Sequence, residues 1–179
     1  GRRAPGTARR PGRARRGGGA PERRQTARVG TRQRGQPHHD AIVGQDRRAG
    51  ATGARLREQG RQTLIQAKTG LLIDAYFSGT KLKWLLDNVP GARAQAERGE
   101  LAFGTIDSWL IWQLTGGAVH ATDVSNASRT MLFNVHTNLW DGELLDLLGI
   151  PPSLIAEVTP SRAHYGEVRP ALLGQALPI

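Results

Sequence analysis

The side chain best suited to chemistry in this sequence is the phenol of Tyr76, in the segment AYFSGTK at residues 75–81. A tyrosine ring can cover the carbon edge of a small hydroxylated ligand, while its hydroxyl donates or accepts one hydrogen bond. The residues also allow a second role, in which Tyr76 is a core aromatic beside Phe77. On the residues alone, the core role is favoured.

Other features suggest catalytic or metal chemistry only weakly. His38-His39-Asp40 has metal-capable side chains, but adjacent residues rarely point at one ion, so a solvated turn is expected. Gly17–Gly19 is not a phosphate-binding loop, because no strand precedes it and no Gly-Lys-Ser/Thr follows it. The chain has no cysteine, which excludes disulfides and thiolate chemistry. No metal site is therefore predicted.

The segment after Tyr76 has the periodicity of an amphipathic helix, with apolar residues at i, i+3, i+4 and i+7. Ser78 or Thr80 is the expected N-cap, and Pro90-Gly91 the expected end. The apolar residues are Leu82, Leu85, Leu86 and Val89, and Lys81 and Lys83 are expected on the solvent-exposed side.

Two more helices are predicted further along the chain. One follows Thr105 as N-cap, carries Asp107 in its first turn, where the helix dipole favours a negative charge, and ends at Gly116-Gly117. The other spans residues 140–148. The side chains expected inside are Ile106, Trp109, Leu110 and Leu114 for the first helix, and Leu144, Leu147 and Leu148 for the second.

The remaining segments indicate strands and one interrupted helix. A surface helix over residues 55–67 is expected to break near Gly60, and residues 119–134 are expected to form strand and loop. Short strands are predicted at 40–43, around 157–158 and at 165–168. Strands that alternate with helices favour α/β layering.

Charge divides the chain into two parts. Residues 1–34 contain twelve arginines and one acidic residue, Glu22, whereas residues 35–179 carry 13 basic and 14 acidic side chains. A segment so rich in Arg, Gly, Pro and Ala cannot bury enough apolar surface to become ordered. One explanation is a basic arm attracted to nucleic acid or anionic lipid. The favoured one is a GC-rich coding region translated in the wrong frame, or a decayed gene, since all four residues have codons written in G and C alone.

Three ordered blocks carry a family resemblance: TGLLIDAYFSGTKLKWLLDN at 69–88, GELAFGTIDSWLIWQLTGG at 99–117 and VHATDVSNASRTMLFN at 119–134. They resemble the glycerol kinases of the FGGY sugar-kinase family. The resemblance implies an α/β fold of the ribonuclease H-like, actin-like ATPase class, here incomplete. Residues 35–179 would form part of the N-terminal sugar-kinase domain, and residues 1–34 an Arg/Gly/Pro/Ala-rich segment that is disordered or a frame error, although the resemblance extends faintly from residue 22.

The resemblance also implies site residues. Tyr76 matches the tyrosine that contacts glycerol in the family, which reverses the preference for a core role. An ungapped alignment places Arg24 on the arginine of a second glycerol-binding motif, and Gln25 on its glutamate. A glutamine lacks the charge that strengthens such a hydrogen bond. The same alignment puts Gly30 and Gly44 where the family usually has tryptophan, so a cavity is expected at Gly44.

By resemblance, the intact enzyme transfers the γ-phosphoryl group of MgATP to glycerol and gives glycerol 3-phosphate. The aspartate that acts as the base is expected beyond Ile179, as is the domain that holds most of the nucleotide site. The only methionine is Met131, so we expect a fragment that is inactive alone and binds no cofactor. Asp123, Asn126 and Arg129 match the third block, where they either hold a loop or touch ligand.

The expected partners are glycerol and ATP, and a cytoplasmic location follows from the resemblance. No apolar run approaches the ~18 residues of a membrane span. The resemblance leaves open whether the intact enzyme is a homo-oligomer. A sister kinase for xylulose or gluconate is the alternative within the family. A nucleic-acid-binding module that uses residues 1–34 is the alternative of another class, and nucleic acid is not the favoured partner.

Overall fold

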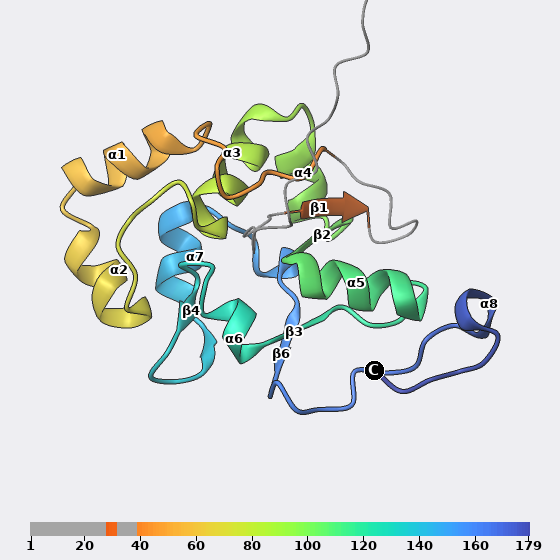
Figure 1. Ribbon diagram of the computed structural model, residues 1–179. Coiled ribbons are helices and arrows are strands. Elements are labelled where there is room, and N and C mark those ends of the chain that lie inside the picture. Colours follow the sequence, from red (N-terminus) through yellow and green to blue (C-terminus); the bar gives the residue numbers. More distant parts are fainter. Residues whose placement is uncertain (1–27, 32–38) are drawn as a thin grey trace, which may run out of the picture.

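Helices and short strands alternate in the computed structural model of this chain, which describes residues 28–31 and 39–179 (Figure 1). The helices are α1 (Gly50–Glu58), α2 (Gln62–Thr69), α3 (Ser78–Asn88), α4 (Ala92–Glu97), α5 (Ile106–Thr115), α6 (Val124–Ala127), α7 (Gly142–Leu148), a 3-10 turn η1 (Pro152–Leu154) and α8 (Pro170–Leu173). The strands are β1 (Arg28–Thr31), β2 (Leu101–Gly104), β3 (Ala121–Asp123), β4 (Phe133–Asn134), β5 (Leu139–Trp140) and β6 (Glu157–Thr159). The expected α/β class is confirmed.

The described strands pair two by two. β1 and β2 are antiparallel, with Val29 opposite Phe103, and both side chains are buried. β3 and β6 are parallel, and β4 and β5 form a short antiparallel hairpin. The indole Nε1 of Trp140 donates to the carbonyl of Ala156 at 2.8 Å, which ties this hairpin to the segment that enters β6.

One hydrophobic core joins α1, α2, α3, α4 and α7 to β1 and β2. Helix α3 is central to this core, because Leu82, Leu85 and Leu86 are buried in it and Val89 packs against the same cluster. The predicted apolar face of this helix is therefore confirmed. The predicted N-caps are wrong. Phe77 occupies the cap position without a side-chain hydrogen bond, so Ser78 already lies inside the helix.

Helix α5 has the expected ends, with Thr105 before it and Gly116 in the left-handed conformation after it. The predicted inner face is wrong for Ile106 and Leu110, which are 45% and 46% exposed, whereas Trp109 and Leu114 are partly buried. The buried residues are Ser108, Ile111 and Thr115, also spaced as one helical face. The helix packs on β2 and β3, and its buried face carries two small side chains besides Ile111, which lets the elements approach closely.

Several other boundaries differ from the prediction. The third helix, α7, begins at Gly142, because Trp140 belongs to β5 and Asp141 caps the helix by accepting from the Leu144 amide. Residues 55–67 form parts of two helices, α1 and α2, that separate around Gly60 as expected. Residues 119–134 contain the short helix α6 besides β3 and β4.

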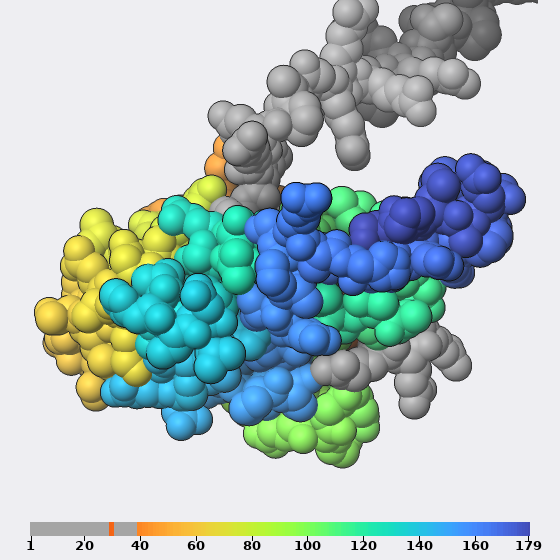
Figure 2. All heavy atoms as spheres, turned by 90° about the horizontal axis from the view of Figure 1, so that it is seen from below, coloured from red at the N-terminus to blue at the C-terminus, as the bar shows by residue number. Residues whose placement is uncertain are grey.

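Two predicted strands are absent from the described residues. Of residues 40–43, only Ile42 forms a bridge, although its side chain is fully buried. Residues 165–168 hydrogen-bond to the last residues of the chain, but only Glu167 and Pro178 form a bridge. This C-terminal segment, with α8, lies at the edge of the molecule (Figure 1; dark blue in Figure 2), where the Arg169 amide donates to the carbonyl of Leu114 near the end of α5 at 2.9 Å.

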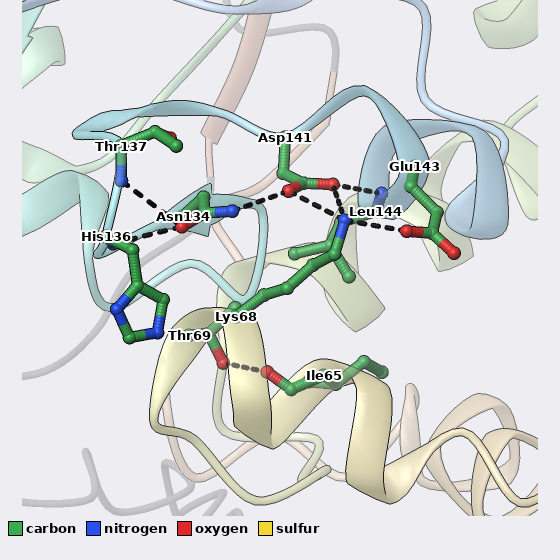
Figure 3. Close-up of polar contacts among 9 residues, drawn as sticks. All are labelled: Ile65, Lys68, Thr69, Asn134, His136, Thr137, Asp141, Glu143 and Leu144. Atoms are coloured by element: carbon green, nitrogen blue, oxygen red, sulfur yellow. Dashed lines mark hydrogen bonds and ion pairs between the residues drawn. The ribbon is translucent and has the colours of Figure 1, made fainter.

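A polar cluster joins α2 to the β4–β5 hairpin and α7 (Figure 3). The ammonium of Lys68 donates to both carboxylate oxygens of Asp141 at 2.9 Å and lies 2.7 Å from Glu143. Asn134 donates to Asp141 at 2.9 Å. Burial raises the pKa of Asp141, but the hydrogen bonds from Lys68, Asn134 and Leu144 outweigh it and hold that pKa below its ordinary value. The carboxylate is therefore charged, and it accepts hydrogen bonds from residues of α2, β4 and α7.

Candidate functional site

The loop before α3 fixes the backbone of Tyr76. The Tyr76 amide donates to the carboxylate of Asp74 at 2.7 Å. The Thr80 hydroxyl lies 3.1 Å from the carbonyl of Phe77 and 3.3 Å from that of Asp74. These bonds link the loop to the first turn of α3. The position of Tyr76 is therefore set by local polar groups as well as by core packing.

The Tyr76 ring is partly buried at the edge of the core. It meets the buried Phe77 ring edge to face, with 5.3 Å between centroids and 87° between planes. The guanidinium of Arg129 lies over that Phe77 ring at 5.1 Å. A ring in this position packs on the protein at one side and keeps some surface accessible, which a ligand contact requires.

Gly79 allows the first turn of α3 to approach the loop that ends the third sequence block. Its amide donates to the carbonyl of Thr130 at 2.7 Å. A Cβ built on Gly79 would lie 2.9 Å from that carbonyl oxygen, closer than real Cβ contacts allow, and 3.0 Å from Leu148 Cδ1, which is tighter than most of them. The next residue, Met131, is fully buried with φ 63°, a conformation uncommon for residues other than glycine. The first and third blocks thus meet directly beside Tyr76.

The second block joins the same assembly through Asp107. Its carboxylate accepts from the Thr122 hydroxyl at 2.6 Å and from the Thr105 hydroxyl, so α5 is linked to β3. In the third block, Asp123 caps α6 and accepts from the amide and the side chain of Asn126 at 2.7 and 2.9 Å. Asp123 and Asn126 therefore hold a loop, one of the two roles that the third sequence block allows.

The prediction that the Lys81 side chain lies on the solvent-exposed side of α3 is wrong. Its side chain is fully buried, and its ammonium lies over the Tyr76 ring, 5.6 Å from the centroid. Burial lowers the pKa of Lys81 to about 8, against the opposing effect of Asp46 and Asp74. Lys83 is partly exposed and pairs with Asp87 at 3.0 Å. Helical periodicity predicted that both lysines would be exposed, and the difference in their burial follows only from how α3 packs in the fold.

Two arginines lie beside Asp74 and Asp46, the acids whose charges act on Lys81. Arg47 is 3.4 Å from Asp74, and both side chains are largely exposed. Arg48 is 2.6 Å from Asp46, and the hydrogen bonds from Arg48 hold the pKa of Asp46 below its ordinary value. The surroundings of Lys81 thus contain charges of both signs.

Several predicted positions fall outside or at the limit of the described residues. Arg24 and Gln25 lie outside them, as does His38. Gly30 lies in β1 opposite Ala102, and Gly44 is buried just after Ile42. The described residues therefore contain Tyr76 but not the second predicted glycerol contact.

Metal-capable side chains are scattered over residues 28–31 and 39–179. No group of three His, Asp or Glu side chains converges there. The described residues thus provide no cluster that would hold Mg²⁺ without the phosphates of a nucleotide. Among the described helices, none has the length and apolar character needed to cross a membrane.

Solved structures with the same arrangement are sugar kinases. Glycerol kinase from Plasmodium falciparum, solved with ADP, superposes with a TM-score of 0.83 at 32% identity, over 87% of this chain and 31% of that protein. Gluconate kinase from Lactobacillus acidophilus superposes with a TM-score of 0.73 at 22% identity, over 83% of this chain and 29% of that one. The fold is therefore that of the sugar kinases of the actin-like ATPase class.

Sequence comparison then gives the family. A family model described as "FGGY family of carbohydrate kinases, N-terminal domain" matches residues 22–177. The glycerol kinase of Polaromonas naphthalenivorans (strain CJ2) is 78% identical over 161 residues, and that of Variovorax paradoxus (strain S110) is 66% identical over 159. These alignments cover 90% and 89% of this chain and 32% of each relative. The chain belongs to the FGGY family of carbohydrate kinases, and it spans about a third of the length of these relatives.

Proposed function

We propose that this chain forms the polyol-binding part of the N-terminal domain of a glycerol kinase, which transfers the γ-phosphoryl group of ATP to glycerol. The observation that carries the proposal is the 78% identity to a protein named glycerol kinase over 90% of the chain. The xylulose and gluconate kinases that share the fold are 22% identical or less, so they support the fold alone. Glycerol is therefore favoured over the sugars that their names mention.

Within this function, Tyr76 contacts the substrate. Its ring would lie along the carbon edge of glycerol and its hydroxyl would bond one glycerol hydroxyl. The anchored backbone and the packing on Phe77 support this role, because they leave the ring little freedom to lose on binding. Arg24 would supply a second contact, and Gln25 a weaker bond than a carboxylate would give.

The complete enzyme would use MgATP, which supplies the phosphoryl group, on a nucleotide site and a catalytic carboxylate that we place outside this sequence. Residues 35–179 would act as the folded part of the sugar-binding domain, in the cytoplasm. The 179-residue chain is then expected to show no ATP-dependent phosphorylation of glycerol. A turnover above background by the purified chain would contradict this division of labour.

The test is a chimera in which residues 22–177 replace the matching segment of the Polaromonas naphthalenivorans protein. We expect ATP-dependent phosphorylation of glycerol, with a lower kcat/KM for xylulose and gluconate. Tyr76→Phe should raise the KM for glycerol about tenfold, the effect of losing one hydrogen bond of about 1.4 kcal/mol. Tyr165→Phe is the matched control, because the Tyr165 hydroxyl bonds only the carbonyl of Pro160 among the described residues.

Two results would count against the proposal. A higher kcat/KM for xylulose or gluconate than for glycerol would assign the chain to a sister kinase. Equal glycerol KM values for Tyr76→Phe and Tyr165→Phe would remove Tyr76 from the site while leaving the family unchanged.

A further inference from the structure

The fully buried lysine beside the candidate ligand-binding tyrosine has no role in the function described so far. Lys81 lies in the second turn of α3, three residues after Ser78 at the helix start. Its side chain has no exposed surface, and its ammonium lies over the ring of Tyr76. Fully buried lysines are rare in proteins unless an interaction compensates for the lost hydration.

The location is electrostatically unfavourable for a cation. The positive end of the helix dipole is at the start of α3, and burial removes water from the ammonium. Burial lowers the pKa of Lys81 to about 8, so most of the population still carries the charge at neutral pH. Asp46 and Asp74 stabilise that charge, and the face of an aromatic ring is a further attraction for a desolvated cation.

We propose that Lys81 is a positioning residue for Tyr76, whose ammonium holds the tyrosine ring in the orientation that binds glycerol. This inference rests on the proposed function, because it assigns a task to a neighbour of the glycerol contact. Lys81 itself is fully buried against the ring, so we assign it no direct contact with glycerol. Its effect on the enzyme should therefore appear in glycerol affinity and should pass through Tyr76.

Lys83 is the internal comparison. It lies on the same helix two residues later, keeps part of its side chain in solvent, and pairs with Asp87 at 3.0 Å. It has the ordinary environment of a surface lysine, in which an ion pair contributes little. Neutralising Lys83 therefore removes a positive charge from α3 without disturbing the contact to the ring.

The experiment measures glycerol kinetics in the chimera carrying Lys81→Met, Lys83→Met, Tyr76→Leu, or Lys81→Met with Tyr76→Leu. Methionine keeps much of the buried length and removes the charge. We expect Lys81→Met to raise the KM for glycerol about tenfold, from the loss of a desolvated cation–π contact, with kcat within about twofold. Lys83→Met should leave both constants unchanged. In the Tyr76→Leu background, Lys81→Met should have no further effect on KM.

A pH profile of the unmodified chimera gives a second readout that needs no change at Lys81. Among the described residues, the charges that raise the pKa of Lys81 are those of Asp46, the neighbour of Arg48, and Asp74, the neighbour of Arg47, and the ring of Tyr76 lies against its ammonium. As pH rises through about 8, the ammonium loses its proton and the attraction to the ring disappears. The glycerol KM should rise between pH 7 and 9, and the rise should be absent in Tyr76→Leu.

The outcomes separate the two proposals. If Tyr76→Leu leaves the glycerol KM unchanged, the proposed glycerol contact fails and this inference fails with it. If Tyr76→Leu raises KM but Lys81→Met does not, or the two effects multiply independently, Lys81 has no positioning role and the glycerol contact stands. If Lys81→Met does not fold, a KM independent of pH between 7 and 9 overturns the inference.

Discussion

Replacing Asp141 by alanine should destabilise the protein more than a typical substitution near the surface does. Its carboxylate caps α7 by accepting from the Leu144 amide at 3.1 Å, and it accepts from Lys68 and Asn134 at 2.9 Å. Only 8% of its side chain is exposed. Loss of the cap costs about 1 kcal/mol, and loss of the charge-assisted bonds about 2 kcal/mol more.

The sum is smaller than for a fully buried pair, because Lys68 is 25% exposed and keeps Glu143 at 2.7 Å. We therefore expect Asp141→Ala to lower the free energy of unfolding in urea by about 3 kcal/mol and to lower the Tm by about 6–12 °C. Asp141→Asn should lose less, since asparagine is also a good N-cap.

Asp146→Ala is the control within the same helix. Asp146 is exposed near the C-terminal end of α7, where a negative charge is unfavourable, so this change should be neutral or slightly stabilising. If the free energies of unfolding of Asp141→Ala and Asp146→Ala differ by less than about 0.5 kcal/mol, the polar cluster does not stabilise the fold as its geometry implies.

Three further predictions concern the same region. Gly79→Ala should lower the free energy of unfolding in urea by about 2 kcal/mol, because the new Cβ would lie 2.9 Å from the Thr130 carbonyl oxygen. An unchanged urea midpoint would mean that the loop at Thr130 can move away without cost. Ser78→Ala should be neutral or stabilising by thermal unfolding, since the buried Ser78 hydroxyl has no hydrogen-bond partner among the described residues; a loss above about 1 kcal/mol would reveal one. Because the folded-state pKa of Asp141 is lowered, its contribution is present above its unfolded pKa of about 3.9 and lost as pH falls through the folded value. The stability gap between the unmodified protein and Asp141→Asn should be constant from pH 5 to 8 and shrink below about pH 4; a gap that persists in acid would contradict the charged state.

Local sequence signals predicted the helices better than their surroundings. The apolar repeat of α3 and the left-handed glycine after α5 follow from residues close in sequence, so both were read correctly. The inner face of α5 depends on how closely β2 and β3 approach it, which favours Ser108 over the more apolar Leu110. Hydrophobicity alone could not reveal that preference.

The candidate site shows the same limit. Tyr76 was singled out by family resemblance, since a partly buried tyrosine beside Phe77 has no signal of its own in one sequence. The burial of Lys81 was missed, because it arises from α3 packing against segments distant in the sequence. The predicted strand at residues 40–43 failed for a related reason: burial of Ile42 produced the apolar signal without a strand.

The most direct test of the central claim places 3-fluorotyrosine at position 76 of the chimera and follows its fluorine resonance during a glycerol titration. The account predicts a saturable shift for the label at Tyr76, with a midpoint that matches glycerol affinity, and no shift for the same label at Tyr165. A resonance at Tyr76 that stays fixed while the enzyme binds and phosphorylates glycerol would contradict it.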